Sequence, residues 1–306
     1  MFRHKQAVTI LSVVILIAAS FAAYIGITSS DGTDSYTYET IRGQKVEIYG
    51  KGLYKHMSSE VAVQGIAQDY VTLFLAVPLL LLSTVWARKN SLKARLLQSG
   101  TLGYFLVTYL FYLTMGMYNF LFLDYVLLLG TSFFAFTLSL LSFEIDKLSG
   151  YFSSRTPVKL SGGFLMFNAV CIALVWLGIV MPPLLNGTIF PREVEHYTTL
   201  IVQGFDLALL LPIAFVAGFL FWRKTPMAYL LAPVYLVFLS LLMTALVGKI
   251  IAMHLQGANV IPVVFIIPTF ALVAIGVSTM LLFNVKDVRQ DALKKELMGM
   301  YMNLFF

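Results

Sequence analysis

The sequence predicts an all-α polytopic membrane protein, a bundle of about eight transmembrane helices with a small extracytoplasmic β-hairpin. Three observations support this prediction: long apolar runs, few charged residues, and a one-sided distribution of Lys and Arg. The 306 residues are 59% hydrophobic and 12% charged, whereas a soluble domain has roughly 25% charged residues. A chain this apolar has too few polar residues to cover the surface of a soluble fold. We therefore expect its surface to face lipid.

The apolar runs each approach the roughly 20 residues that cross a bilayer. The stretch Leu97–Phe143 is too long for one span, and we divide it at Gly116–Asn119 because Gly and Asn suit a tight turn. The first run follows Arg3 and Lys5 and has features of a signal peptide, but its length favours a membrane anchor. The expected spans are Ala7–Thr28, Gln68–Trp86, Leu97–Met117, Phe120–Phe143, Gly163–Met181, Leu200–Trp222, Met227–Ile251 and Ile261–Phe283.

The basic residues set the expected orientation. With the N-terminus inside, 15 of the 21 Lys and Arg residues lie in cytoplasmic segments, 5 lie outside, and Lys249 lies within a span. This bias predicts a cell-membrane protein with both termini in the cytoplasm. The net charge of +6 does not indicate nucleic-acid binding, because the basic residues sit in short loops between apolar runs.

Two segments outside the spans carry their own predictions. The outer segment 29–67 contains two runs of β-forming residues, Tyr36–Ile41 and Lys45–Tyr49, on either side of Gly43. This pattern predicts the hairpin. In the cytoplasmic tail, 286–306, charged residues give way to apolar ones. We expect either an amphipathic helix on the inner leaflet or the frayed end of the eighth span.

The two halves of the chain share an order of residues, which predicts a 4+4 parallel tandem repeat. Each half has one span, an outer segment and three further spans, so the halves would be related by an axis along the membrane normal. The expected units are residues 1–147, which include the outer segment 29–67, and residues 148–285. The shared order is Gln64-Gly65, Asp69, Pro78, Trp86 and Arg88-Lys89 in the first half, and Gln203-Gly204, Asp206, Pro212, Trp222 and Arg223-Lys224 in the second.

Ionisable residues within spans are costly and mark candidate sites. Two interpretations remain open. In one, the candidates line a polar cavity that is open to the outside and either binds a cation or small polar solute or relays protons. In the other, the Asp residues cap helix starts, and Lys249 forms a salt bridge with one of them. All candidates are expected near the outer membrane boundary: Asp69, Asp124, Asp206, Lys249, Gln64, Gln203, Asn119 and Tyr118.

Several signatures are missing from the sequence. It contains neither the P-loop pattern nor His-Glu-x-x-His, and its single cysteine, Cys171, can form neither an internal disulfide nor a thiolate metal site. We therefore expect no metal or other cofactor. No nucleophile stands out, which favours a non-enzymatic protein over a membrane enzyme acting on lipid or quinone.

Parts of the first half resemble a family of uncharacterised multi-pass prokaryotic integral membrane proteins. The resemblance implies a membrane protein but assigns no functional residues. Our working hypothesis is a carrier of ions or small solutes, whose partners are the lipid bilayer and a small polar solute or cation. The alternative is a non-catalytic structural or accessory subunit that binds another membrane protein. The residues that carry the resemblance are Gly43–Glu47, Gln68-Asp69, Arg88–Arg95 and Tyr118–Leu123.

Overall fold

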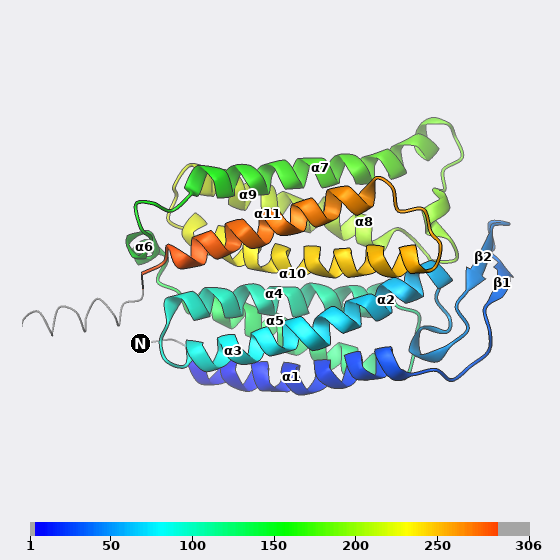
Figure 1. The fold of residues 1–306 in the computed structure, drawn as a ribbon, viewed down its shortest axis with the longest axis horizontal. Coiled ribbons are helices and arrows are strands. Elements are labelled where there is room, and N and C mark those ends of the chain that lie inside the picture. The colour runs from blue at the N-terminus through cyan, green and yellow to red at the C-terminus, as the bar shows by residue number, and fades with distance from the viewer. Residues whose placement is uncertain (1–3, 287–306) are drawn as a thin grey trace, which may run out of the picture.

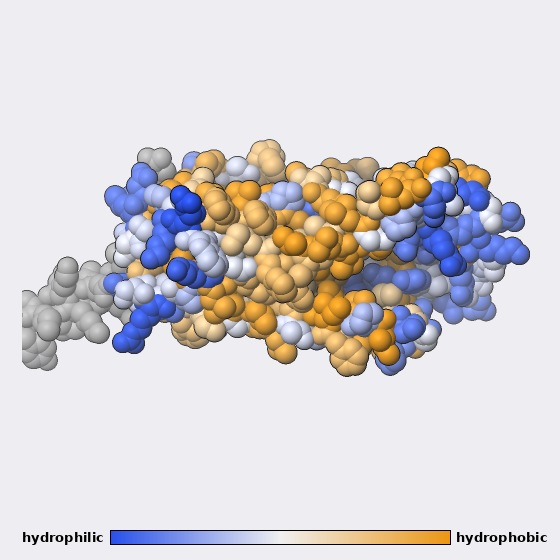
Figure 2. All heavy atoms as spheres, turned by 90° about the horizontal axis from the view of Figure 1, so that it is seen from above, coloured by the Kyte–Doolittle hydropathy of each residue, from blue (hydrophilic) through white to orange (hydrophobic). Residues whose placement is uncertain are grey.

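The computed structural model describes residues 4–286, which form a bundle of long helices running side by side (Figure 1). Within these residues, eight helices are long and apolar enough to cross a membrane, as the sequence predicts. Figure 2 shows a broad apolar band between two hydrophilic ends. The spans are α1 (Lys5–Thr28), the combined α2 (Ser59–Val71), η2 (Thr72–Ala76) and α3 (Val77–Ala87), α4 (Leu92–Thr114), α5 (Phe122–Leu141), α7 (Val158–Leu185), the combined α8 (Ile201–Phe205), η5 (Asp206–Leu210) and α9 (Leu211–Trp222), α10 (Ala228–Leu255) and α11 (Val263–Phe283).

The two ends of the bundle differ in what they carry (Figure 1). The start of α1 and the end of α11 lie at one end, which we call the basic end. The strands lie at the other, which we call the hairpin end. The predicted tail, residues 286–306, lies outside the described residues apart from Lys286. The short elements are β1 (Tyr36–Glu39), β2 (Lys45–Ile48), η1 (Gly52–Tyr54), α6 (Ile145–Leu148), η3 (Ser149–Tyr151) and η4 (Arg192–Val194).

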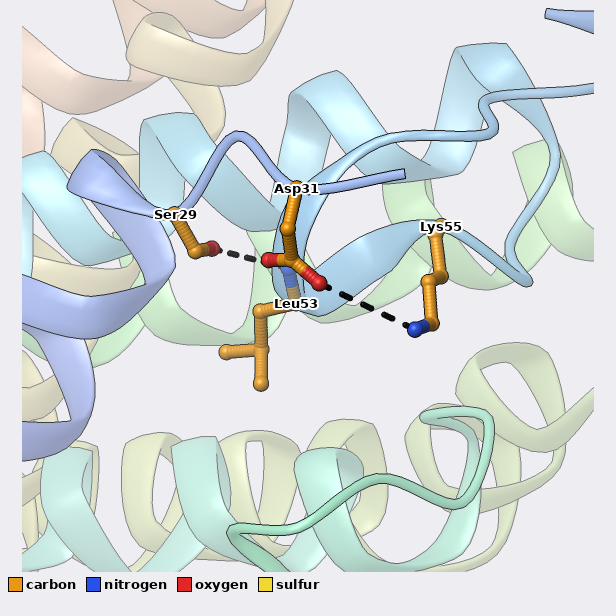
Figure 3. A network of polar contacts seen from close by, with 4 residues as sticks. All are labelled: Ser29, Asp31, Leu53 and Lys55. Atoms are coloured by element: carbon orange, nitrogen blue, oxygen red, sulfur yellow. Dashed lines mark hydrogen bonds and ion pairs between the residues drawn. The ribbon is translucent and has the colours of Figure 1, made fainter. Parts of the chain in front are cut away.

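The predicted hairpin is present and is fastened to the helices beneath it. β1 and β2 pair antiparallel with Tyr36 opposite Ile48. Below the strands, the Leu53 backbone N–H donates to the Ser29 hydroxyl at 2.8 Å, which fixes η1 to the end of α1 (Figure 3). Alone, a two-stranded hairpin is marginally stable in water, so these attachments hold it in place.

The hairpin also docks on the second half of the chain. The guanidinium of Arg42, in the turn between the strands, donates to the backbone carbonyls of Glu195 and Tyr197 at 3.1 and 3.2 Å. The Tyr197 hydroxyl in turn accepts from the Ser58 backbone N–H at 3.2 Å. The outer segments of the two halves therefore form one connected layer at the hairpin end.

The second span begins earlier than the hydropathy predicts. We expected its start at Gln68, but the helix begins at Ser59, after Ser58 in the N-cap position. Its first turns carry Glu60 and other polar residues, so they were left out of a span that was predicted from its apolar residues. Because helix α2 extends beyond the apolar run, residues that the sequence placed at a helix start lie in the middle of a helix.

Two spans contain a π-helical segment at the same place. The π-helices η2 and η5 begin at Thr72 and Asp206, each six residues before a proline, Pro78 or Pro212. Proline lacks the N–H that an α-helix needs and so favours such an interruption of the helical ladder. Twelve residues after each proline, the backbone adopts a positive φ, 61° at Asn90 and 57° at Lys224. The π-helix, the proline and the positive-φ residue therefore have the same spacing in both spans, and the two spans can be aligned over this stretch without gaps.

The centre of the bundle is the pair α4 and α10, which are the most buried spans and pack against each other. Gly100 permits their close approach, since a Cβ there would lie 2.4 Å from the Val237 Cβ. Around this pair, α3 and α5 pack against α4, α9 and α11 pack against α10, and α2 also packs against α10. The neighbours α3 and α5 of α4 thus correspond in chain order to the neighbours α9 and α11 of α10.

Candidate functional site

Asp69 is the most deeply enclosed of the candidate residues. It lies within α2, is 2% exposed, and its carboxylate accepts two tyrosine hydroxyls. Tyr54 of η1 donates to Oδ2 at 2.5 Å, and Tyr112 of α4 donates to Oδ1 at 2.8 Å. Burial and the Asp69 charge raise the pKa of Tyr54 well above its usual value, so its hydroxyl keeps the donated proton at neutral pH. Asp69 therefore does not cap a helix start, and that interpretation is wrong for this residue.

Helix α1 packs closely against the Asp69 carboxylate. A Cβ added at Gly26 would lie 1.8 Å from Asp69 Oδ2 and 3.2 Å from the Tyr54 hydroxyl. Only a glycine permits this approach of the α1 backbone to the carboxylate. Four elements, α1, η1, α2 and α4, consequently meet at Asp69.

A second set of hydrogen bonds continues from Asp69 toward the membrane centre. The Gln68 amide donates to Tyr104 at 2.7 Å and to Thr108 at 3.3 Å, and Tyr104 also bonds Thr72 at 2.9 Å. The other amide atom, Gln68 Oε1, is buried without a hydrogen-bond partner among the described residues. A buried acceptor of this kind needs an explanation, such as a ligand or a water.

Lys249 brings a positive charge to the same region from α10. This helix packs against α2, and a Cβ at Gly248 would lie in ordinary contact with Val71 at 3.5 Å. The Lys249 charge interacts with Asp206 and with Asp69. The expected direct ion pair is wrong, however, because within residues 4–286 no carboxylate lies within 4.0 Å of the Lys249 ammonium.

Asp206 completes the group from the second half. It is the first residue of η5 and is partly buried. Its Oδ2 accepts from the Trp176 indole of α7 at 2.8 Å. Five residues of helix precede it, so Asp206 does not lie at the start of its span either. In the register set by the π-helices, Asp206 corresponds to Thr72 and Gln203 corresponds to Asp69, whereas the order of residues in the sequence paired the two Asp residues with each other.

The remaining candidates lie around this group with less specific roles. Asp124 occupies the first turn of α5, where a carboxylate faces the positive end of the helix dipole. Asn119 Oδ1 accepts from the Leu121 N–H at 2.9 Å and shapes the predicted turn. Tyr118 is 79% exposed. Gln64 and Gln203 are partly buried, and the described residues provide no hydrogen-bond partner for either amide.

Several residues of the site escaped the sequence analysis. Tyr54, Tyr112, Gly26 and Trp176 were not among the candidates, because nothing local links an aromatic residue to a carboxylate far along the chain. One signal was available. Tyr104, Thr108 and Tyr112 recur at intervals of four residues, which places three hydroxyls on one face of α4.

Helix α4 carries a further polar cluster toward the basic end. The buried Gln98 amide donates to Thr84 at 3.0 Å and to Ser12 at 3.3 Å, and Ser99 bonds Ser139 at 2.6 Å. Hydrogen-bonding side chains thus recur along α4 over about 21 Å between Gln98 and Tyr112, at 1.5 Å per residue.

No group of three or more His, Cys, Asp or Glu residues suited to a metal ion occurs within residues 4–286. The eight apolar helices are compatible with a multi-pass integral membrane protein. Comparisons of the chain with protein-family models, curated proteins and solved structures found no match.

Proposed function

We propose that this protein is a carrier of a small cation or small polar solute in the cell membrane, with both termini in the cytoplasm. The observation that carries the proposal is that the Lys249 charge interacts with both Asp69 and Asp206, carboxylates from the two halves of the chain that lie at or near two π-helical segments. In many transporters, the substrate binds near the interface of two repeats at interrupted helices. Interruptions of this kind are frequent at functional sites.

The two halves are proposed to be a tandem duplication, residues 1–147 and 148–285. The matched π-helices, prolines and positive-φ residues support this, as do the matching neighbours of α4 and α10. Two similar units that pack through α4 and α10 could move against each other at this contact, which is how such carriers expose a site to each side of the membrane.

The atoms around Asp69 favour a cation over an anion. The polar atoms around Asp69 are oxygens: those of its carboxylate, the Tyr54 and Tyr112 hydroxyls and the Gly65 carbonyl. The Gly65 carbonyl accepts a hydrogen bond from the Tyr112 hydroxyl at 3.2 Å. Oxygen atoms are the ligands preferred by hard cations. A cation bound at Asp69 would weaken the attraction between Asp69 and Lys249. Because these residues belong to different halves, cation binding would change how strongly the halves hold together.

Tyr54 would form the outer gate. It belongs to the segment beneath the hairpin and covers the carboxylate from that side. In the proposed orientation the hairpin end faces outward, because the excess of Lys and Arg lies in the loops of the other end. Solute entering from outside would therefore displace Tyr54 before it reaches Asp69.

The test uses purified protein in sealed liposomes, with gradients of Na⁺, K⁺ or H⁺ imposed in turn. We expect flux of at least one of the three ions, and its loss in Asp69→Asn and in Lys249→Met. The matched control is Asp146→Asn, which removes an exposed carboxylate of α6 at the basic end and should retain full flux. Thermal melting of each variant separates lost function from lost folding.

Two results would count against the carrier. Wild-type liposomes that stay impermeable to all three ions, or a folded Asp69→Asn variant with unchanged flux, would remove its support. A structural or accessory subunit would then be the better hypothesis, and its prediction is that neutral substitutions at Asp69 and Lys249 leave partner binding intact.

A further inference from the structure

A groove lies at the basic end, on the boundary between the two halves. It has a volume of about 450 Å³ and is bounded by the end of α3, the start of α4 and the end of α11. Trp86, Leu97, Leu282 and Phe283 form much of its apolar wall. Trp86 and Phe283 are 53% and 77% exposed, so the wall opens to the outside of the bundle, where lipid would lie.

One rim of the groove is strongly basic. Lys89 and Lys93 line it directly. The Lys5 ammonium also comes close, because it donates to the backbone carbonyl of Arg88 at 2.5 Å. The segments that form the groove, 86–98 and 279–286, contain neither Asp nor Glu. The rim therefore offers positive charge without a competing carboxylate from these segments.

The start of α4 adds to this charge. The rim lies at the N-terminal turn of a 23-residue helix that has no acidic residue in its first turn. The helix dipole there favours an anion. An apolar slot that opens to the hydrocarbon and ends in a cationic rim matches one class of ligand, in which an acyl chain joins a phosphate. Basic pockets between membrane helices on the cytoplasmic side bind such head groups.

We propose that this groove binds an anionic phospholipid of the leaflet at the basic end. An acyl chain lies against Trp86, Leu97 and Phe283, and the head-group phosphate pairs with Lys89 and Lys93. Since the wall combines α3 and α4 of the first half with α11 of the second, the lipid joins the two halves at the end opposite Asp69. The proposal stands on the groove alone and does not depend on the carrier function.

The experiment measures lipid binding to the full-length protein after delipidation in detergent. Native mass spectrometry and thermal melting compare phosphatidylglycerol with phosphatidylcholine of the same acyl chains. We expect tighter binding of phosphatidylglycerol and a higher melting temperature with it. Each lysine near an anionic head group contributes a preference of about fivefold. The variant K89Q/K93Q should lose most of this preference while binding phosphatidylcholine as before.

The matched control is K159Q/K224Q. These lysines line a second depression of about 430 Å³ at the same end of the molecule, so the variant loses the same charge on the same side. It should keep the preference for phosphatidylglycerol. Inorganic phosphate serves as a separate probe and should raise the melting temperature little, because it has no acyl chain.

Three results would overturn the proposal. Equal binding of the two lipids would show that the rim does not select charge. An equal loss in K159Q/K224Q would reduce the effect to the general charge of this end. Stabilisation by phosphate as large as that by phosphatidylglycerol would indicate a soluble anion instead of a lipid.

Discussion

Gly26→Ala is the sharpest probe of the Asp69 site, because one added methyl group meets the carboxylate itself. The new Cβ would lie 1.8 Å from Asp69 Oδ2 and 2.8 Å from its Cγ, whereas ordinary contact begins at 3.4 Å. The short Asp69 side chain cannot move away from the added methyl group while it accepts hydrogen bonds from both tyrosines. Either α1 moves away from α2 or the carboxylate leaves its two donors.

The expected cost follows from these two routes. Overpacking a close-packed interior costs about 1–3 kcal/mol. Loss of a hydrogen bond to a charged acceptor costs about 1.5–3 kcal/mol for each bond. Because the structure will relax by whichever change costs less, we expect Gly26→Ala to lower the free energy of unfolding by about 2–3 kcal/mol. Thermal unfolding in detergent measures it, and the ion flux described above should fall in parallel.

Gly130→Ala provides the matched control. Gly130 lies in the middle of α5, and a Cβ there meets nothing within 4 Å. This substitution should be neutral or stabilising by up to about 1 kcal/mol, which is the gain in helix propensity from Gly to Ala. Both variants carry that gain, so the difference between them isolates the contact at Asp69.

A double variant tests the cause. In an Asp69→Ala background, the carboxylate is absent and Gly26→Ala should cost much less than in the wild type. An unchanged cost in that background would show that the clash involves something other than the carboxylate. A Gly26→Ala protein that melts like Gly130→Ala would refute the close approach of α1 altogether.

Two further predictions concern the orientation of the protein and a carboxyl group at the hairpin end. Single cysteines at Gln44 and Gly150, in a background without Cys171, should differ in labelling by an impermeant thiol reagent. Gln44 should react in intact cells and Gly150 only after lysis, and external labelling of Gly150 would reverse the proposed orientation. Burial, together with the nearby charges of Glu60 and Glu193, raises the pKa of Glu195, so the folded state favours the protonated carboxyl. Folding stability should therefore decline relative to Glu195→Gln as the pH rises above 4.5, the ordinary pKa of this group, and a constant difference in melting temperature from pH 4.5 to 7 would contradict this.

The sequence by itself determined the number of long apolar helices, the hairpin and the turn near Asn119. These features depend on local signals, since a run of apolar residues, a β-forming pair of segments or a Gly-Asn turn acts through its own composition. These local signals do not predict where a helix begins when its first turns are polar. Helix α2 begins at Ser59 and not at Gln68, because its polar first turns extend beyond the apolar run on which the prediction rests.

Only the tertiary structure decided what surrounds Asp69. Its donors, Tyr54 and Tyr112, lie 15 and 43 residues away along the chain, and Gly26 reaches it from another helix. Such contacts depend on which helix faces meet and at what depth, and a single sequence does not record that choice. Lys249 is a second example. Its depth suggested an ion pair, but in the structure its charge interacts with Asp206 and Asp69 without direct contact to either.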